Sequence, residues 1–349
     1  MAPKLADIET LAIRCPNWVG DVVMATPVFD CLRANLPGTK IVGVLKRSAR
    51  GIVSDSPWFD GLVDGNDKSW ADFRRMRTQL RAWSPDAAIL LTNSMRSALT
   101  FRLSGVRQLY GYRRQWRDLL LAGGPAPIRD GQRVVPIPMI EYYLGICRWL
   151  GLDVPALPRP RLYIGQDLAR RGDAILQKYG IAEDDCLVGM NPGASFGSSK
   201  CWPAEYFGEL ADLCRRNLNA RVILFGGPGE EDILQAILDR AKVDVIDTRP
   251  DKIDLELLKP MVKRCNLFIT NDTGPRHYAV AFDVPTVVIV GPTDVRYTDA
   301  NLERTAVVRR ELDCSPCHKK VCPRGHECMI DIRPAEVFAA AERLLKTCR

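Results

Sequence analysis

Long hydrophobic runs are missing from the start of this sequence. Acids at Asp7, Glu9 and Asp21, with polar residues between them, interrupt the first 25 residues. We therefore expect neither a secretory signal peptide nor a membrane-spanning helix there, and the expected compartment is the cytoplasm. Short repeats and low-complexity tracts are missing as well.

Two nucleotide-binding signatures are also missing. No Gly-x-Gly-x-x-Gly follows the first expected strand, which argues against a nucleotide-dependent oxidoreductase, and no Walker sequence occurs. A strong charge of one sign is missing too, because 49 Lys and Arg stand against 42 Asp and Glu. The resulting charge of +7 on 349 residues does not indicate a nucleic-acid-binding protein.

Apolar runs alternate with amphipathic stretches along the whole chain, a pattern typical of parallel sheets covered by helices. We expect strands near residues 10–15, 40–46, 87–92, 108–112, 187–191, 220–226, 243–246, 266–270 and 285–290. We expect helices near residues 22–35, 69–83, 138–150, 166–179, 203–217, 229–241, 254–264, 275–282 and 334–347.

The stretch GLDVPALPRPRLYIGQ, residues 151–166, interrupts this alternation with three prolines and indicates a domain boundary. The chain length also fits two domains. We predict an α/β protein with two doubly wound domains that face each other across a cleft. The expected domains are residues 1–158 and 159–333. A closing helix is expected in residues 334–349, and one option is that it packs on the amino-terminal domain. Ligands of such sheets bind beyond the carboxyl ends of the strands.

Two loops of the second half are suited to phosphate. NPGASFGSSKCWP, residues 191–203, offers backbone amides, Lys200 and a helix start, which together suit an anion. The alternative is a solvated surface lysine. In NDTGPRH, residues 271–277, Gly274 permits close approach and Pro275 suits the first helical position. There the alternative for Asp272 or Thr273 is an ordinary helix cap, and for His277 a packed first-turn histidine.

Two acids follow strands. Glu230, after the glycine turn of VILFGGPGEEDI, is a candidate for binding ribose hydroxyls, or else an acid that complements a helix dipole. Asp21, in the Gly20-Asp21 turn after the first strand, is a candidate general base. Its alternative is an acid at a helix start.

Residues 92–117 contain six arginines and no acid, with Tyr110, Tyr112 and Trp116 between them. Arginine binds carboxylates and phosphates through two bonds, so this stretch suits an acidic partner that contains a ring, or it is a solvated basic face.

Twelve cysteines occur, and several of them, such as Cys15, Cys31, Cys147 and Cys265, lie in apolar segments, which favours buried thiols in a reducing compartment. A late group differs in its spacing and is a candidate for zinc, with free thiols or disulfides as the alternatives. It consists of Cys314, Cys317, Cys322 and Cys328.

Six stretches in the same order between residues 11 and 331 resemble the lipopolysaccharide heptosyltransferases of glycosyltransferase family 9, and among them the type II enzymes. They are PNWVGDVVMATP, LTNSMRSAL, GYRRQWR, NPGASFGSSKCWP, TNDTGPRHYAVAFDVPTVVIVGPT and CSPCHKKVCPRGHECM. The resemblance implies a GT-B fold of two Rossmann-like domains, the acceptor on the first and the nucleotide sugar on the second.

The resemblance also implies the reaction: an inverting transfer from ADP-L-glycero-β-D-manno-heptose to the first heptose of the inner core, carried by Kdo and lipid A. No cofactor or metal is implied. The enzyme would work at the inner face of the inner membrane in transient contact with it. Heptosyltransferase I, another ADP-sugar transferase, a nucleotide-sugar epimerase of the same fold, and a basic module that docks on anionic lipid or RNA remain alternatives.

Residue by residue, the resemblance implies that Asp21 is the general base. It also implies which residues bind the donor and which bind the acceptor. The donor residues are Ser195, Lys200, Glu230, Asp272, Thr273, Gly274, Pro275, Arg276 and His277, and the acceptor residues are Asn93, Arg96, Arg113, Arg114 and Arg117. Two positions depart from the family pattern. SFGSSK stands where type II enzymes often end in Pro-Ala-Lys, and Arg276 stands where an uncharged residue is usual.

Overall fold

The computed structural model describes residues 5, 8–67 and 69–348, and the chain divides into two units between Tyr163 and Ile164. The division falls in the proline-containing segment, slightly after the expected boundary at residue 158. Residues 1–4, 6, 7, 68 and 349 lie outside the described part, and with them Asp7 and the last residue of the expected closing helix. Among the described helices, none has the length and apolar character needed to cross a membrane.

Unit 1 contains a five-stranded sheet in the order β3-β2-β1-β4-β5, in which every neighbouring pair is parallel. The strands are β1 Thr10–Arg14, β2 Lys40–Leu45, β3 Gly61–Asp64, β4 Ala87–Leu90 and β5 Gln108–Gly111. A small antiparallel pair is formed by β6 Arg129–Asp130 and β7 Arg133–Val134. All residues of β1 and β4 are buried, as expected for central strands that are covered on both faces.

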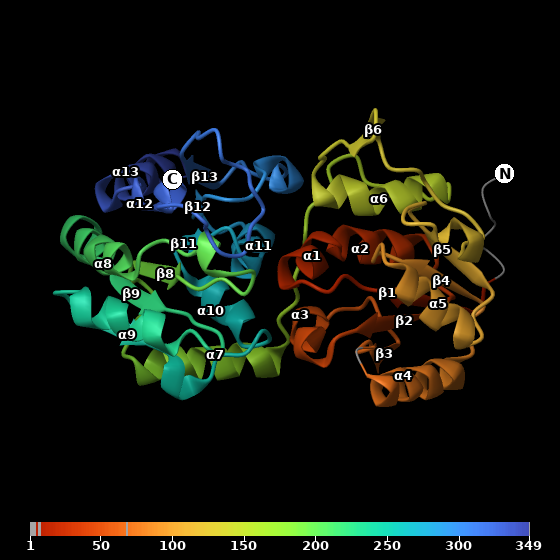
Figure 1. The fold of residues 1–349 in the computed structure, drawn as a ribbon. Helices are drawn as coiled ribbons and strands as arrows, with labels where there is room; N and C mark the ends of the chain where they lie inside the picture. Colours follow the sequence, from red (N-terminus) through yellow and green to blue (C-terminus); the bar gives the residue numbers. More distant parts are fainter. Residues whose placement is uncertain (1–4, 6–7, 68, 349) are drawn as a thin grey trace. The chain divides into compact units, whose positions relative to one another are not determined.

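Helices cover both faces of the unit 1 sheet, with α2 and α6 together on one face and α4 and α5 on the other (Figure 1). They are α1 Val19–Met24, α2 Thr26–Asn35, α3 Arg50–Val53, α4 Trp70–Trp83, α5 Met95–Leu103 and α6 Met139–Trp149. The single helix predicted over residues 22–35 is two helices, because Pro27 lies in the first turn of α2, where a proline is tolerated only at a helix start.

Unit 2 contains a six-stranded parallel sheet in the order β10-β9-β8-β11-β12-β13, the doubly wound order of a Rossmann sheet. The strands are β8 Leu187–Asn191, β9 Arg221–Leu224, β10 Val245–Asp247, β11 Leu267–Asn271, β12 Thr286–Val290 and β13 Thr305–Arg309. All residues of β8, β11 and β12 are buried.

In unit 2, α8 packs against α9 and α13, and α10 packs against α7 and α11. The helices are α7 Gln166–Lys178, α8 Ala204–Leu218, α9 Glu231–Arg240, α10 Leu258–Arg264, α11 Gly274–Ala281, α12 Glu327–Ile330 and α13 Pro334–Thr347. The closing helix α13 lies on β12 and β13 of its own unit, and Val337 and Ala341 are fully buried in the core there. Its position in unit 2 follows from this apolar face.

Candidate functional site

In both sheets the strand order reverses between two neighbours, and the loops that leave such neighbours open a crevice for ligands. In unit 2 the neighbours are β8 and β11, and in unit 1 they are β1 and β4. The loop after β8 contains Lys200, and the loop after β11 contains Asp272. Lys200 and Asp272 therefore lie where a doubly wound sheet binds its ligand.

Asp272 is the centre of a buried group of charges in unit 2. The ammonium Nζ of Lys200 donates to the backbone oxygen of Asp272 at 2.7 Å and to its Oδ2 at 3.0 Å. A guanidinium NH of Arg276 donates to Oδ1 at 2.8 Å, and the hydroxyl of Thr293 donates to Oδ2 at 2.6 Å. We call Asp272, Lys200, Arg276 and Thr293 the Asp272 cluster.

The Asp272 cluster holds an excess of one positive charge. Burial by itself would raise the pKa of Asp272, but Arg276, Lys200 and the hydrogen bond from Thr293 hold this pKa far below its usual value. The carboxylate therefore stays ionised between two cations. Burial lowers the pKa of the neighbouring His277 to about 3, so this imidazole is neutral at physiological pH and neither adds to nor cancels the excess.

The side chain of Asn271 connects the loop after β8 to the end of β11. The side-chain oxygen of Asn271 accepts from the backbone N–H of Trp202 at 3.2 Å, and its amide nitrogen donates to the backbone oxygen of Pro192. Trp202 is itself anchored, because its indole N–H donates to the backbone oxygen of Ile332 at 2.9 Å. Lys200 is thus carried on a loop that is fixed at both ends.

The start of α11 follows directly after Asp272. Thr273 stands at the N-cap in an extended conformation, and no side chain among the described residues caps this helix. The alternative of an ordinary Thr273 cap is therefore not seen, while Asp272 uses its carboxylate in the cluster. Gly274 and Pro275 begin the first turn, where the Gly274 N–H and the helix dipole favour negative charge, while Pro275 has no N–H.

Glu230 lies against the loop after β8. Its Oε2 accepts from the backbone N–H of Gly227 at 2.7 Å, and a Cβ on Gly193 would stand 1.9 Å from its carboxyl carbon. A larger residue at position 193 would therefore displace the carboxyl end of Glu230. Burial raises the pKa of Glu230. Ser195 is exposed in the same loop.

In unit 1, Asp21 lies in the first turn of α1, directly after β1, and is half-buried. The hydroxyl of Tyr143, on α6, donates to Oδ1 of Asp21 at 2.9 Å. Burial, and then the charge of Asp21, raises the pKa of Tyr143 well above its ordinary value, so the hydroxyl keeps its proton and remains a donor. Tyr143 thereby orients the carboxylate of Asp21.

A second tyrosine of α6 orients a side chain in the loop after β4. The Tyr142 hydroxyl donates to the side-chain oxygen of Asn93 at 2.9 Å. Its ring stacks on Tyr112, with centroids 3.8 Å apart and planes at 9°. Neighbouring residues of one helix thus hold both predicted residues, Asp21 and Asn93.

Arg117 differs from the other predicted acceptor residues. It is fully buried, and its guanidinium donates to the backbone oxygens of Tyr112, at 2.8 Å, and Thr92. Burial lowers its pKa to about 10. Arg117 therefore holds its loop from inside and is not on the surface that an acceptor could reach. Arg96 and Arg113 are exposed, and Arg114 is half-buried.

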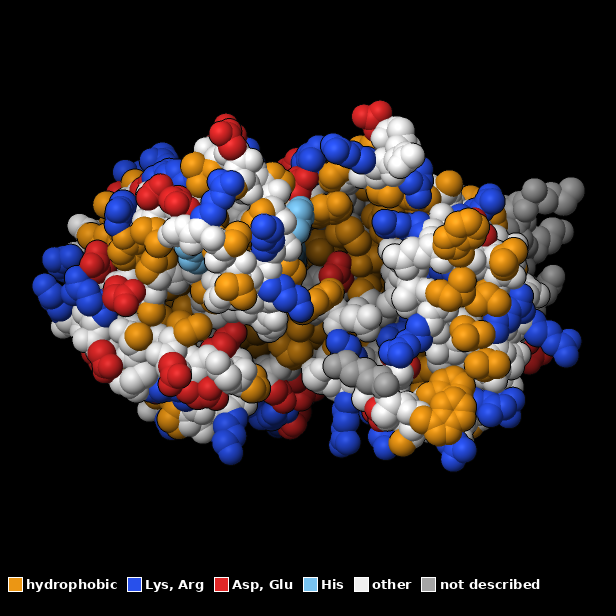
Figure 2. Space-filling view, in the orientation of Figure 1, with side chains coloured by type: hydrophobic (Ala, Val, Ile, Leu, Met, Phe, Trp, Pro, Cys, Tyr) orange, Lys and Arg blue, Asp and Glu red, His pale blue; other side chains and the backbone are white. Residues whose placement is uncertain are grey.

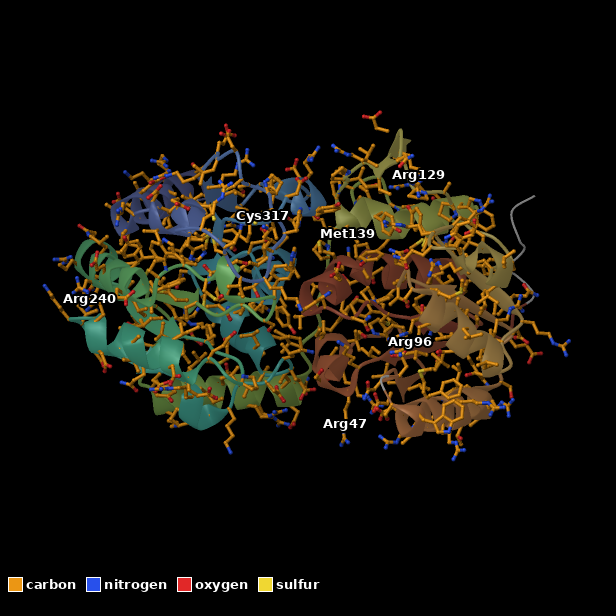
Figure 3. The ribbon with its side chains drawn as sticks, viewed as in Figure 1. Arg47, Arg96, Arg129, Met139, Arg240 and Cys317 are labelled. Carbon is orange, nitrogen blue, oxygen red and sulfur yellow. The ribbon has the colours of Figure 1, made fainter. Side chains whose placement is uncertain are left out.

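The four late cysteines belong to a loop that supports the Lys200 loop from outside. The loop carbonyls of Lys319 and Lys320 accept from the Ser199 hydroxyl, at 2.5 Å, and its N–H, at 3.1 Å. His326 Nε2 lies 2.8 Å from the backbone oxygen of Ser199. Figure 3 labels Cys317 in this loop.

The thiols of the late cysteines are free and line a cavity of about 240 Å³. Its lining residues include Cys314, Cys317, Cys322, Cys328 and His326. Among the residues that the structure describes, no three His, Cys, Asp or Glu side chains are grouped as metal ligands. Burial, followed by the three neighbouring thiols, raises the pKa of Cys328 to about 11.

Comparison with known proteins identifies the family of this chain. The sequence profile of Glycosyltransferase family 9 (heptosyltransferase) matches residues 73–327. The chain belongs to glycosyltransferase family 9. The assignment made from the six sequence stretches is thus confirmed, and the protein is a glycosyltransferase.

Family 9 relatives are similar to the chain over nearly its whole length. Lipooligosaccharide heptosyltransferase 2 of Campylobacter jejuni is 26% identical over 341 residues, covering 96% of this chain and 98% of the relative. Lipopolysaccharide heptosyltransferase 3 of Escherichia coli is 25% identical over 354 residues, covering 94% and 96%.

Solved structures confirm the predicted fold class. The structure of Escherichia coli ADP-heptose lps heptosyltransferase II matches with a TM-score of 0.77 at 24% identity, covering 97% of this chain and 98% of that one. The two Rossmann-like sheets are those of a GT-B enzyme. The predicted placement of the two domains about a cleft stays a prediction.

Several residues of this family 9 site were not found from the sequence. Thr293 follows β12, 21 positions after Asp272, and it is the last residue of one of the six stretches, but the sequence pattern assigned it no role. Tyr142 and Tyr143 could have been noticed, because a pair of adjacent tyrosines occurs in an expected helix. Tyr142 binds Asn93, 49 positions away, and Tyr143 binds Asp21, 122 positions away. The sequence pattern does not connect residues that lie so far apart.

The close approach of Gly193 to Glu230 generates a prediction. In Gly193→Ala the new Cβ displaces the carboxyl end of Glu230, and we expect ADP affinity to fall roughly tenfold with unchanged thermal stability, the loss of about one charged hydrogen bond. Gly227→Ala is the matched control, because a Cβ there meets Glu230 at 3.6 Å, an ordinary contact. Calorimetric titration with ADP measures both. Equal affinities for the two variants would contradict the expectation that Glu230 binds the nucleotide.

Proposed function

We propose that this family 9 enzyme is a heptosyltransferase II. It would transfer L-glycero-D-manno-heptose from ADP-heptose to the first heptose of the lipopolysaccharide inner core and invert the anomeric centre. Relatives named heptosyltransferase 2 and heptosyltransferase 3 both resemble the chain at similar identity, so the acceptor is the part that experiment must decide.

The Asp272 cluster is the observation that carries the proposal. It places two cations around one carboxylate at the crevice of a Rossmann sheet. The exposed fractions of the three side chains are small, at 14% for Lys200, 11% for Asp272 and 2% for Arg276. A buried excess of positive charge is stabilised by an anion, and the diphosphate of a nucleotide sugar is the anion that this crevice would take.

The remaining donor residues surround this charge. Thr273 and Gly274 would offer their backbone N–H groups to a phosphate at the start of α11, and Pro275, which has no N–H, would fix the first turn. Glu230, on the loop after β9, would accept hydrogen bonds from the ribose hydroxyls, with Ser195 nearby on the exposed rim of the Lys200 loop. His277, neutral and buried, would contact the donor without adding charge.

The chemistry is a single in-line displacement in which unit 2 holds the donor and unit 1 supplies the base. The acceptor oxygen forms a bond to C1 of the heptose while its proton passes to the Asp21 carboxylate. The bond from C1 to the diphosphate oxygen breaks, and its electron pair leaves with ADP. Lys200, Arg276 and the helix dipole would stabilise the negative charge that grows on the leaving group.

Asp21 suits the part of general base because Tyr143 fixes its orientation through one oxygen. On the same unit, Asn93, Arg96, Arg113 and Arg114 would bind the carboxylates and phosphates of the acceptor. Arginine is well matched to such groups because it offers two parallel donors. The burial of Arg117 leaves it outside this set.

An assay with purified acceptors tests the proposed step. The protein, ADP-heptose and heptosyl-Kdo-lipid A should give ADP and a diheptosyl product in equal amounts, while Kdo-lipid A without heptose should give at least roughly tenfold less product, because the acceptor groups are placed for a heptose. Preference for Kdo-lipid A would make the enzyme a heptosyltransferase I. An isomerised sugar released without any acceptor would indicate an epimerase.

Replacement of the proposed base gives a second test. Asp21→Asn keeps the shape and the contact with Tyr143 but cannot take a proton, so we expect kcat to fall on the order of a hundredfold or more. The dissociation constant of ADP should not change, because unit 2 is untouched. Tyr143→Phe, which only loosens the carboxylate, should lose less. Near-normal turnover by Asp21→Asn would end its assignment as the base.

A further inference from the structure

The positive charge of this protein is concentrated in one segment of unit 1. The 51 residues from Trp70 to Leu120 contain ten arginines, no lysine and three acids, so their balance of +7 equals that of the whole chain. The other 298 residues therefore balance to zero. The mild overall charge conceals a strongly basic region.

The same segment exposes large apolar side chains. Of the eleven such side chains that are exposed in the described part of the chain, six lie here: Trp70, Met95, Leu99, Leu103, Trp116 and Leu119. Trp116 and Leu119 are 87% and 89% exposed, which is almost complete. Full exposure of a tryptophan and a leucine in one short loop is unfavourable in water and indicates a surface that something covers.

These side chains come from adjoining elements. Met95, Leu99 and Leu103 are spaced by four residues and so form one stripe along α5. The 3₁₀ turn Arg117–Leu120 packs against α5, and Arg102 donates to the backbone oxygen of Leu120 at 3.1 Å. On the other side α4 packs against α5, and Arg77 donates to the backbone oxygen of Leu103 at 3.0 Å.

We call the exposed surface of α4, α5 and residues 113–120 the arginine face. Figure 2 shows apolar and basic side chains intermingled over this part of unit 1, and Figure 3 labels Arg96 on α5. Its exposed arginines are Arg74, Arg75, Arg81, Arg96 and Arg113.

The acids of the segment do little to neutralise the arginine face. Asp86 turns its carboxylate to the backbone N–H groups of Glu9 and Thr10, both at 3.0 Å. Asp72 accepts from Ser69 at the start of α4 and lies 3.8 Å from Arg75, and Asp118 lies 3.5 Å from Arg113. Such exposed pairs are weak, so most of the positive charge remains available.

We propose that the arginine face docks on an anionic lipid bilayer, with Trp116 and Leu119 inserted at the boundary between headgroups and acyl chains. The exposed arginines of α4, Arg74, Arg75 and Arg81, would bind lipid phosphates, and the α5 stripe would rest at the interface. The choice of a bilayer rests on the proposed function in one respect, since the acceptor of that reaction is anchored in lipid. It rests otherwise on the combination of charge and apolar exposure.

RNA would fit the arginines but not the leucines. Single-stranded nucleic acid binds to basic grooves in which aromatic rings stack on bases, and aliphatic side chains at full exposure contribute nothing to that contact. A bilayer uses both kinds of side chain at once, because tryptophan and leucine gain from leaving water while arginine stays at the phosphates.

Vesicle flotation with the full-length protein tests the docking. Phosphatidylcholine vesicles that contain phosphatidylglycerol should bind at least about tenfold more tightly than pure phosphatidylcholine vesicles, and high salt should weaken the binding. Trp116→Ser with Leu119→Ser should weaken it about tenfold, since both inserted groups are lost. Leu157→Ser is the matched control, because Leu157 is 85% exposed outside the arginine face.

Fluorescence identifies the inserted residue. Lipids brominated on the acyl chain should quench the protein's tryptophan emission, and Trp116→Phe should keep vesicle binding while losing most of the quenching. Equal binding to neutral and anionic vesicles, an undiminished affinity of the double variant, or tight binding of an RNA oligonucleotide in place of vesicles would overturn the proposal.

Calorimetry with ADP separates this proposal from the proposed function. If vesicles fail to bind while ADP binds, the docking surface is wrong and the transferase assignment stands. If vesicles bind but ADP does not, the arginine face stands and the donor site is wrong.

Discussion

The carboxylate of Asp272 is the constraint on which the site of unit 2 depends. It is buried, so it can remain ionised only between the cations of Lys200 and Arg276, and it fixes both of them where two neighbouring strands end. Two buried cations against one carboxylate leave a positive charge that water cannot easily solvate. This imbalance is the basis of the anion site proposed for the crevice, and Asn271, Trp202 and the cysteine-containing loop hold the Lys200 loop in place.

Unit 1 is also doubly wound, but it carries different side chains in its crevice. Its crevice also lies where the strand order reverses, but the side chains placed there are a carboxylate and an amide, held by two adjacent tyrosines of α6. A carboxylate whose orientation is fixed by a tyrosine hydroxyl suits the proton transfer proposed for it. In the proposed reaction the two Rossmann-like sheets would differ in their chemistry because their loops carry different side chains.

The sequence predicted the sheets well because buried parallel strands are nearly continuous apolar runs, as in LVGMN and LFITN. It missed β3 and β13, whose residues are mostly half-buried, and α5, whose apolar residues do not form a clear inward stripe. It placed Lys200 and Asp272 in suitable loops, yet their pairing over 72 positions and the hydroxyl of Thr293 depend on tertiary packing. The burial of Arg117 could not be predicted, because a buried arginine and a solvated one have the same sequence signature.

Calorimetric titration of Lys200→Gln with ADP and with AMP tests the central claim most directly. If the excess positive charge of the Asp272 cluster binds the diphosphate, the variant should lose about tenfold or more in affinity for ADP, the loss of a charged hydrogen bond, and much less for AMP, which lacks the β-phosphate. An equal loss for both nucleotides, or no loss for ADP, would contradict the account.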